Sequence, residues 1–362
     1  MKLAIIGGTG FLGSYFLENY AAQFAQVKCL NRNRDVFEKF SFGPTETIEG
    51  KLNDEAAISK LLQGMDVLVH AGFDHNYAEN VQGMENIIQA IRQKNSTVKR
   101  VVYLSSYVVY DRGHKEITEE SPQSNYGDIY TEEKLSIEKL IRESASPAEF
   151  IILQPTIVLG RGGNWSKVLV EAANSEVVKL SKRGEGICNY VYAKDVADAI
   201  YRAVVVMSQK FPCAVNSFLI TGGTDTWKNV MLSQAGIALK SGLSQPKSPK
   251  IEDTYDGKYG NSWLENLIIS TMYSSAVRLI AGPTLKFIKQ KINERRPGRQ
   301  ISDQSMKEYS FRGLSMALQR AECVVNDNKA KTILGYEATY GLAELAADMR
   351  GNPADNRDKA SH

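Results

Sequence analysis

Short apolar runs recur at regular intervals along the first part of the chain, and each is bounded by polar residues or glycine. The runs lie at residues 2–6, 27–30, 66–70, 100–104 and 150–153. Continuous apolar runs of this length are typical of strands that are buried on both faces of a sheet. We therefore expect these five segments to form the centre of the fold.

Helical patterns lie between these runs, for example at residues 55–63, 80–93 and 128–143. The alternation of strand and helix predicts an α/β fold with a doubly wound parallel sheet. A chain of 362 residues can bury a sizeable core. One large domain with a substrate lobe suits this length better than several small domains.

Three glycines, Gly7, Gly10 and Gly13, follow the first predicted strand and precede a predicted helix. Glycine permits a tight turn and lets the backbone approach a pyrophosphate, whose charge then lies at the positive N-terminus of the helix. We therefore predict a dinucleotide site in this loop, which includes Phe11 and Leu12. An ordinary strand-to-helix turn is the alternative for the loop taken alone.

The second predicted strand ends in Asn31 and Arg32, with Arg34 two residues further on. A site for NAD(H) usually has an acidic residue here, which binds the ribose 2′-hydroxyl, whereas an arginine can pair with a 2′-phosphate. The sequence therefore favours NADP(H), and NAD(H) stays open. Two arginines that merely face the solvent are the alternative.

A serine, a tyrosine and a lysine form the candidate catalytic set. Ser106 follows the strand at 100–104, at the edge of the sheet where ligands bind in open α/β folds. Tyr130 and Lys134 are one turn apart on a predicted helix, so the lysine ammonium can lower the cost of the phenolate and bring its pKa nearer neutrality. Together with the glycine loop, these residues predict proton transfer beside hydride transfer.

At this point the chain resembles the extended short-chain dehydrogenase/reductase family over nearly its whole length. Besides the glycine loop, the resemblance rests on Asn80-Val81-Gln82-Gly83, Ser105-Ser106-Tyr107-Val108-Val109-Tyr110, Tyr130-Thr131-Glu132-Glu133-Lys134, the segments 154–160 and 190–197, and the segment 326–336.

The resemblance implies roles for individual residues. Tyr130 would be the general acid/base, Lys134 its electrostatic partner and ribose anchor, and Ser106 the residue that orients the substrate oxygen. Among its departures from the family pattern are two at expected contacts: Gln154 stands where arginine is frequent, and Lys51 stands where an acid commonly contacts the adenine.

The resemblance also implies a domain organisation. Residues 1–155 would form a Rossmann-type cofactor-binding core, to which residues 190–222 return. Residues 156–189 and 223–350 would form a smaller, mostly C-terminal substrate lobe, and the polar tail at 351–362 is predicted to be disordered. A homodimer is common in the family.

Two features help to select a branch of the family. Sugar 4,6-dehydratases have an acidic pair after the catalytic serine or threonine, but this chain has Tyr107 and Val108. Nucleotide-sugar members often have an arginine where this chain has Cys188, and cysteine cannot pair with a diphosphate.

The first hypothesis is therefore an NADP(H)-dependent oxidoreductase for a hydrophobic ketone or secondary alcohol, similar to the 3β-hydroxysteroid dehydrogenase and dihydroflavonol reductase branch. A nucleotide-sugar epimerase is the alternative. A non-catalytic cofactor-binding protein is a third, weaker hypothesis, because the chain keeps both Tyr130 and Lys134.

The segment 264–299 supports this choice of branch. Its first part is apolar, and residues 286–299 then carry six basic residues against one glutamate, interleaved with apolar ones. Two interpretations stay open: a solvated helix of the substrate lobe, or a basic amphipathic helix that contacts a membrane surface.

Composition narrows the remaining classes. The net charge of +3 is close to neutral for this length, so a general role with nucleic acid is not expected. The four cysteines have neither metal-ligand spacing nor the density of a disulfide scaffold. With a strand predicted from residue 2, no signal peptide is expected. We therefore predict a cytoplasmic enzyme without a metal, with membrane association left open.

Overall fold

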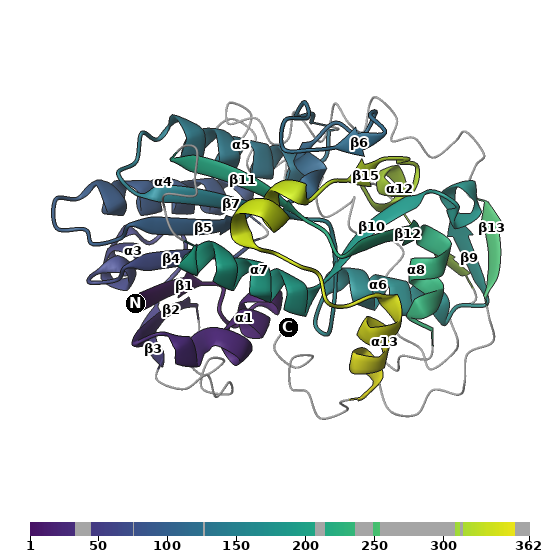
Figure 1. Cartoon of the computed structure of the whole chain (residues 1–362), viewed down its shortest axis with the longest axis horizontal. Helices are drawn as coiled ribbons and strands as arrows, with labels where there is room; N and C mark the ends of the chain where they lie inside the picture. Colours follow the sequence, from purple (N-terminus) through teal and green to yellow (C-terminus); the bar gives the residue numbers. More distant parts are fainter. Residues whose placement is uncertain are drawn as a thin grey trace, which may run out of the picture.

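The computed structural model of the chain describes residues 1–32, 45–74, 76–125, 127–206, 214–235, 249–253, 308–311 and 314–351. Its centre is a seven-stranded parallel sheet with the strand order β11-β7-β5-β4-β1-β2-β3 (Figure 1). The strands are β1 (Lys2–Ile6), β2 (Gln26–Asn31), β3 (Thr45–Glu49), β4 (Val67–His70), β5 (Arg100–Leu104), β7 (Glu149–Pro155) and β11 (Val215–Ile220). Each of the five predicted apolar runs lies in one of these strands, so the predicted sheet is confirmed.

Helices cover both faces of this sheet. One face carries α1 (Phe11–Tyr20) and α7 (Ala193–Val205), and the other carries α3 (Glu55–Leu62), α4 (Tyr77–Arg92) and α5 (Ile129–Glu143). Side chains along a strand point alternately to opposite faces. In β1, Leu3 and Ile5 accordingly join the apolar cluster under α1 and α7, while Ala4 and Ile6 join the other cluster.

Side-chain caps fix where the helices α3, α4 and α5 begin. Asp54, Asn76 and Asp128 each stand at the N-cap, and their side chains accept hydrogen bonds from backbone N–H groups of the first turn. Because Asn76 caps α4, this helix starts at Tyr77, three residues before the predicted segment. The predicted helices at 55–63, 80–93 and 128–143 are otherwise confirmed.

The order of the strands reverses at β1. The chain runs from β1 outward through β2 to β3, and then returns to the other side of β1 at β4. Connections that diverge in this way leave a crevice at the carboxyl ends of the two strands, which is where open α/β folds bind their ligands. The glycine loop and the residues after β4 both lie at this crevice.

A smaller lobe lies beyond the carboxyl ends of the strands (Figure 1). It contains two three-stranded sheets, with the orders β12-β10-β8 and β13-β9-β14. Its elements are β8 (Ile157–Leu159), α6 (Asn164–Ala173), β9 (Val177–Leu180), β10 (Ile187–Tyr192), β12 (Gly223–Thr226), α8 (Trp227–Ser233), β13 (Lys250–Asp253), β14 (Glu308–Ser310), α12 (Leu314–Gln319) and α13 (Leu342–Gly351).

The boundaries expected from the sequence can be compared with these elements. The division at residue 155 falls between β7 and β8. Tyr190 to Tyr192 pair with β8 in the lobe, and α7 follows from Ala193 on the face of the central sheet.

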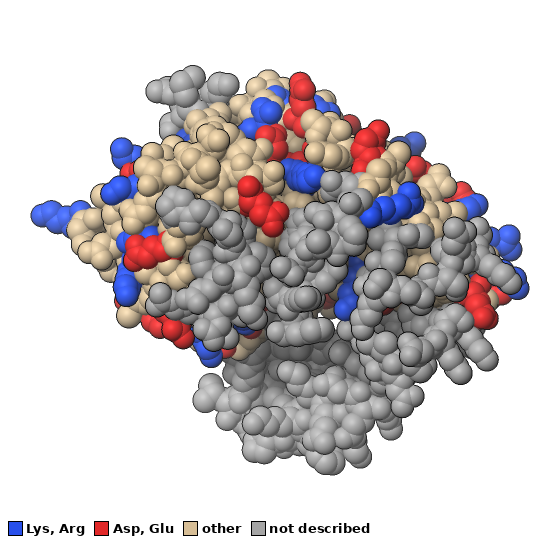
Figure 2. All heavy atoms as spheres, turned by 90° about the horizontal axis from the view of Figure 1, so that it is seen from below, with Lys and Arg blue, Asp and Glu red and all other residues tan. Residues whose placement is uncertain are grey.

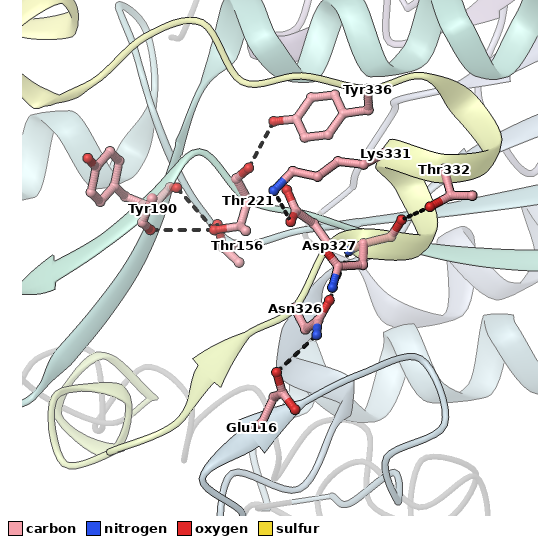
Figure 3. A network of polar contacts seen from close by, with 11 residues as sticks. Glu116, Thr156, Tyr190, Thr221, Asn326, Asp327, Lys331, Thr332 and Tyr336 are labelled. Atoms are coloured by element: carbon pink, nitrogen blue, oxygen red, sulfur yellow. Dashed lines mark hydrogen bonds and ion pairs between the residues drawn. The ribbon is translucent and has the colours of Figure 1, made fainter.

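The C-terminal part of the chain ties the lobe to the core. A short strand, β15 (Val324–Val325), pairs with β6 (Glu116–Ile117), and Asn326 donates a hydrogen bond to Glu116 at 2.9 Å. The turn η5 (Ala330–Leu334) then contacts α7 and β11. Figure 3 shows how Tyr336 reaches back to donate its hydroxyl to the Thr221 carbonyl, 3.0 Å away. Part of the segment expected in the lobe thus lies on the core.

Positive and negative side chains are interspersed over the described surface seen in Figure 2, without a large area of one sign. Within the described ranges no helix is long and apolar enough to cross a membrane. Arg34, the segment 264–299 and the predicted tail from residue 352 onward lie outside the described residues.

Candidate active site

The glycine loop turns tightly between β1 and α1. Gly7 has a φ of 81°, in the region that favours glycine, and its carbonyl accepts a hydrogen bond from the N–H of Gly10 at 2.9 Å. A β-carbon on Gly13 would lie 2.0 Å from the same Gly7 carbonyl oxygen. Glycine at these positions therefore lets the backbone of the loop pack closely against the first turn of α1.

The first turn of α1 carries no side-chain cap, because Gly10 occupies the N-cap position. The amides of this turn, including those of Phe11 and Leu12, thus lie at an open helix N-terminus directly after the glycine turn. Such a terminus favours an anion. These features fit the pyrophosphate of a dinucleotide.

Asn31 ends β2 and is buried beside the glycine loop. Its Oδ1 accepts a hydrogen bond from Thr9 Oγ1 at 3.2 Å. Its Nδ2 faces the weakly accepting thiol of Cys29 and has no oxygen partner within the described part of the chain. A buried amide donor without an oxygen partner, at the end of the second strand, fits a ribose oxygen.

Arg32 extends from the next position, and its side chain is 69% exposed. Its Nη1 pairs with Asp74 Oδ2 at 2.9 Å. Sequence reasoning did not find Asp74, which follows β4 and comes close to Arg32 only through the order of the strands. Arg34, the second predicted arginine, lies outside the described residues.

The structure brings Ser106, Tyr130 and Lys134 together at the carboxyl end of β5. Ser106 stands directly before the turn η2 (Tyr107–Val109), and Tyr130 lies in the first turn of α5. The side chains of Ser106 and Tyr130 share a hydrogen bond. Lys134 Nζ lies 5.6 Å from the centre of the Tyr130 ring.

Lys134 is buried, and its ammonium donates to two oxygens of β5. These acceptors are the Tyr103 hydroxyl and the Leu104 carbonyl, each 3.1 Å away. Burial lowers the pKa of Lys134 from 10.5 to about 8, although the nearby carboxylates Glu133 and Glu138 favour the charged form. The charge of Lys134 therefore titrates much closer to neutrality than that of an exposed lysine.

The pKa of Tyr130 moves against the expectation from the sequence. Burial raises this pKa from 10.0 to about 12, and the hydrogen bond with Ser106 only partly opposes the rise. The spacing of Tyr130 and Lys134 alone predicts that the ammonium lowers this pKa. In the structure Lys134 instead directs its protons to Tyr103 and Leu104.

Several residues around the set were not found from the sequence as site residues. Phe73 is 45% exposed and meets the Tyr130 ring edge-on, with 5.8 Å between the ring centres. Asn80 donates to the Glu133 carboxylate at 2.8 Å and to the Asp74 carbonyl at 2.6 Å. These contacts join the loop after β4 to the helix that carries Tyr130.

His70 is buried at the end of β4. Its ring meets that of Tyr103 edge-on, with 5.5 Å between the ring centres. Burial lowers the pKa of His70 from 6.5 to about 3, and Lys134 adds to this effect. The imidazole is therefore neutral beside the lysine.

Behind the set, the fully buried carboxylate of Glu138 organises a polar network. It accepts hydrogen bonds from Ser105 Oγ at 2.5 Å and from Gln154 Nε2 at 2.8 Å. Gln154 in turn accepts a hydrogen bond from the Tyr110 hydroxyl. Arg142 on α5 forms an ion pair with Glu138, with 3.5 Å between Nη2 and Oε2. Gln154 thus holds its place by hydrogen bonds where the family pattern has arginine.

Lys51, the second departure from the pattern, is exposed just beyond β3. Among the described residues, no cluster of three or more His, Cys, Asp or Glu side chains is arranged to hold a metal ion.

Comparisons with known proteins agree with this architecture. The model of the NAD dependent epimerase/dehydratase family matches residues 3–211. The 2-alkyl-3-oxoalkanoate reductase of Stenotrophomonas maltophilia is 23% identical over 241 residues, which is 62% of this chain and 71% of the relative. The decarboxylating sterol-4-alpha-carboxylate 3-dehydrogenase of Bos taurus is 24% identical over 236 residues, which is 61% of this chain and 65% of the relative.

Among solved structures, UDP-glucose 4-epimerase from Bifidobacterium longum in complex with NAD+ and UDP has a TM-score of 0.65 and 15% sequence identity. The match covers 96% of this chain and 97% of that chain. At this identity the likeness shows a shared fold.

Proposed function

Because the chain belongs to the NAD-dependent epimerase/dehydratase family, we propose that it is an NADP(H)-dependent oxidoreductase acting on a hydrophobic ketone or secondary alcohol. The observation that carries the proposal is the meeting of Ser106, Tyr130 and Lys134 at the carboxyl edge of the sheet, where only β4 separates β5 from the strand β1 that leads into the glycine loop. Enzymes of this type need a group beside the nicotinamide that donates and accepts a proton, and Tyr130 in this arrangement can be that group.

The cofactor would lie across the carboxyl ends of β1 and β4. The glycine loop and the first turn of α1 would hold its pyrophosphate, and Asn31 and Arg32 would hold the adenosine ribose. Lys134 would anchor the nicotinamide ribose. We favour NADP(H) because Arg32 offers a cation at the end of β2, where no acidic side chain precedes it.

When bound, the nicotinamide supplies or accepts the hydride. In the reducing direction Tyr130 donates its hydroxyl proton to the substrate oxygen, and in the oxidising direction it takes the proton back. Ser106 donates a hydrogen bond to the same oxygen and orients it toward Tyr130. The nearby ammonium of Lys134 stabilises the phenolate that forms when Tyr130 gives up its proton.

The preference for an apolar substrate rests on the surroundings of Tyr130 and on the relatives. Phe73 is one of the few large apolar side chains exposed among the described residues, and it lies against Tyr130. Two relatives are named for the oxidation or reduction of a 3-oxygenated alkanoate or sterol. An apolar ketone or alcohol would cover Phe73 and complete its burial.

A nucleotide-sugar epimerase is the alternative, since the family's name includes epimerases. The surroundings of Cys188 argue against it. Cys188 is fully buried in β10, and its register partner in β12 is Asp225. Burial and the nearby Asp225 raise the pKa of the Cys188 thiol well above its usual value, which means that a negative charge is unfavourable at this position. A diphosphate at this position would meet repulsion instead of an arginine.

A thermal-shift experiment tests the proposal. The protein is loaded with NADPH and exposed to two panels: nucleoside diphosphates with their sugars, and lipophilic ketones and alcohols. A ligand that binds only the folded state raises stability by RT ln(1 + [L]/Kd). We expect stabilisation by the apolar carbonyl compounds, followed by their reduction. Stabilisation by a nucleoside diphosphate alone would contradict the proposal and favour the epimerase.

A third outcome, in which the cofactor binds and no ligand of either panel stabilises the protein or turns over, would favour the non-catalytic hypothesis. The cytoplasmic location, the homodimer and the membrane contact of residues 264–299 stay predictions from the sequence.

A further inference from the structure

The ion pair between Arg32 and Asp74 joins two loops at the adenosine end of the crevice. Arg32 follows β2 and Asp74 follows β4, and the carboxyl ends of these strands flank that of β1. The distance between Arg32 Nη1 and Asp74 Oδ2 is 2.9 Å. The cation that would recognise a 2′-phosphate is therefore already paired with a carboxylate of the same chain.

Arg32 and Asp74 differ in how exposed and how constrained their side chains are. The Arg32 side chain is 69% exposed, whereas that of Asp74 is 21% exposed. The backbone of Asp74 is held at both ends by one amide: its N–H donates to Asn80 Oδ1 at 2.8 Å, and its carbonyl accepts from Asn80 Nδ2 at 2.6 Å. Asn80 is itself buried and bonded to Glu133. Asp74 is therefore the more constrained partner, and the exposed Arg32 side chain has more room to change its conformation.

We propose that Asp74 competes with the 2′-phosphate of NADP(H) for Arg32 and so sets how strongly this chain prefers the phosphorylated cofactor. The proposal rests on the cofactor assignment made above. A phosphate that binds Arg32 must displace Asp74 or share the guanidinium with it. In either case part of the gain from the phosphate contact is lost, because the ion pair between Arg32 and Asp74 is broken or weakened.

NAD(H) presents a neutral 2′-hydroxyl, so its binding leaves the ion pair intact. The buried amide of Asn31 is positioned to donate to such a hydroxyl. Asp74 therefore narrows the difference in affinity between the two cofactors, and a chain with Asp74 is expected to use both. Asp74 lies after β4, outside the end of the second strand where the specificity for NAD(H) or NADP(H) is usually sought.

The variant Asp74→Asn isolates the charge. Asp74 Oδ1 accepts a hydrogen bond from the N–H of Asn76 at 2.9 Å, and an asparagine side chain can keep this bond. The matched control is Glu79→Gln, which removes one negative charge five residues away on α4. Glu79 accepts from Asn76 and forms no ion pair in the described part of the chain.

The measurement is the dissociation constant of NADPH and of NADH, from the fluorescence of the bound nicotinamide. Asp74→Asn should tighten NADPH binding by about three- to fivefold, the range expected for an exposed ion pair. It should leave NADH binding within about twofold. Glu79→Gln should leave both constants close to those of the unaltered chain.

A double-substitution cycle tests the competition itself. Arg32→Ala should weaken NADPH binding by about tenfold. In that background Asp74→Asn should no longer tighten it. A full gain in the absence of Arg32 would mean direct repulsion and would overturn the competition, as would weaker or unchanged NADPH binding in Asp74→Asn alone.

The same titrations separate this inference from the proposed function. If neither cofactor binds the unaltered chain, the proposed function fails. If NADPH binds and Arg32→Ala has no effect, the phosphate contact of Arg32 fails. If Arg32→Ala weakens binding and Asp74→Asn changes nothing, only the role of Asp74 fails.

Discussion

The ammonium of Lys134 lies 3.1 Å from the hydroxyl of Tyr103, a side chain in the middle of the sheet that belongs to no recognisable motif. Tyr103 is buried and its ring meets that of His70 edge-on. A charged lysine in this apolar position needs oxygen acceptors, and β5 supplies them through Tyr103 and the Leu104 carbonyl. Tyr103 and Leu104 therefore fix where the ammonium lies.

The first prediction concerns this hydrogen bond. Tyr103→Phe removes one of the two oxygen acceptors, which disfavours the charged form of Lys134. The pKa of Lys134 should fall below its present value of about 8, by about one unit. Turnover needs the ammonium, so the loss of activity at high pH should begin at a lower pH. The measurement is the pH dependence of turnover on the ketone or alcohol that binds best.

A matched control is Tyr336→Phe, which also removes a buried tyrosine hydroxyl. Within the described residues, this hydroxyl donates a hydrogen bond to the Thr221 carbonyl and has no contact with Lys134. It should lower stability without moving the pH profile. An unchanged profile in Tyr103→Phe would show that Leu104 alone keeps the ammonium charged.

The second prediction concerns the proton donor. Tyr130→Phe keeps the aromatic ring against Phe73 and removes the hydroxyl. Turnover should fall by about 10²- to 10⁴-fold, the usual contribution of a general acid or base. NADPH binding, followed by fluorescence, should stay within about threefold, because the glycine loop is untouched.

Tyr77→Phe is the control for Tyr130→Phe. The Tyr77 hydroxyl also hydrogen-bonds a serine, Ser136 at 2.7 Å, but this contact joins α4 to α5. Its removal should leave turnover nearly unchanged. Substantial turnover by Tyr130→Phe would reject Tyr130 as the acid/base.

The third prediction is a dependence of stability on pH that arises at His70. The pKa of His70 is about 3 in the folded chain and 6.5 when unperturbed, so between these values the unfolded chain binds one more proton. The free energy of unfolding should therefore fall as the pH decreases from 6.5 toward 3, by up to about 1.4 kcal/mol per pH unit from this group. His70→Gln should lack this contribution.

Urea unfolding of both proteins between pH 7 and pH 4 measures it. His70→Gln should be the less stable protein at pH 7, since it loses the packing against Tyr103, and the gap should narrow as the pH falls. Glu133 and Asp195 also have raised pKa values, but they titrate in both proteins and cancel in the difference. A constant gap would contradict the prediction.

The fourth prediction tests the glycine loop. Gly13→Ala places a methyl group 2.0 Å from the Gly7 carbonyl oxygen, which is backbone and can move only with the turn. We expect a loss of about 1–3 kcal/mol in the free energy of unfolding and a large loss of NADPH affinity. The methyl group of Gly113→Ala would lie nearest the partly exposed side chain of Asp111, at 3.3 Å, so stability should change by less than about 0.5 kcal/mol. Equal effects of the two substitutions would contradict this role of the loop.

Sequence patterns located most of the core elements because these signals are local. Apolar runs and helical spacing are properties of neighbouring residues, so β1, β4 and α3 could be located to within a residue or two at most boundaries. The lobe was harder to predict. Its strands are short, and β10 was assigned in part to the core because pairing with β8 and β12 depends on segments far apart in the chain.

The predicted site residues were found for the same reason. Gly7, Gly10 and Gly13 are spaced three residues apart in one short segment, and Tyr130 and Lys134 are one helical turn apart. Ser106 was placed at the carboxyl edge of the sheet because it follows a predicted strand, and the structure brings the three together.

By itself, then, the sequence determined the parallel sheet, the glycine loop and the types of side chain at its carboxyl edge. Only the tertiary structure decided what these side chains contact. In the folded chain the Lys134 ammonium donates to Tyr103, Arg32 forms an ion pair with Asp74, and burial raises the pKa of Tyr130. The physical reason is that burial and distance in space determine hydrogen bonds and charges, and both arise only when distant strands are brought side by side.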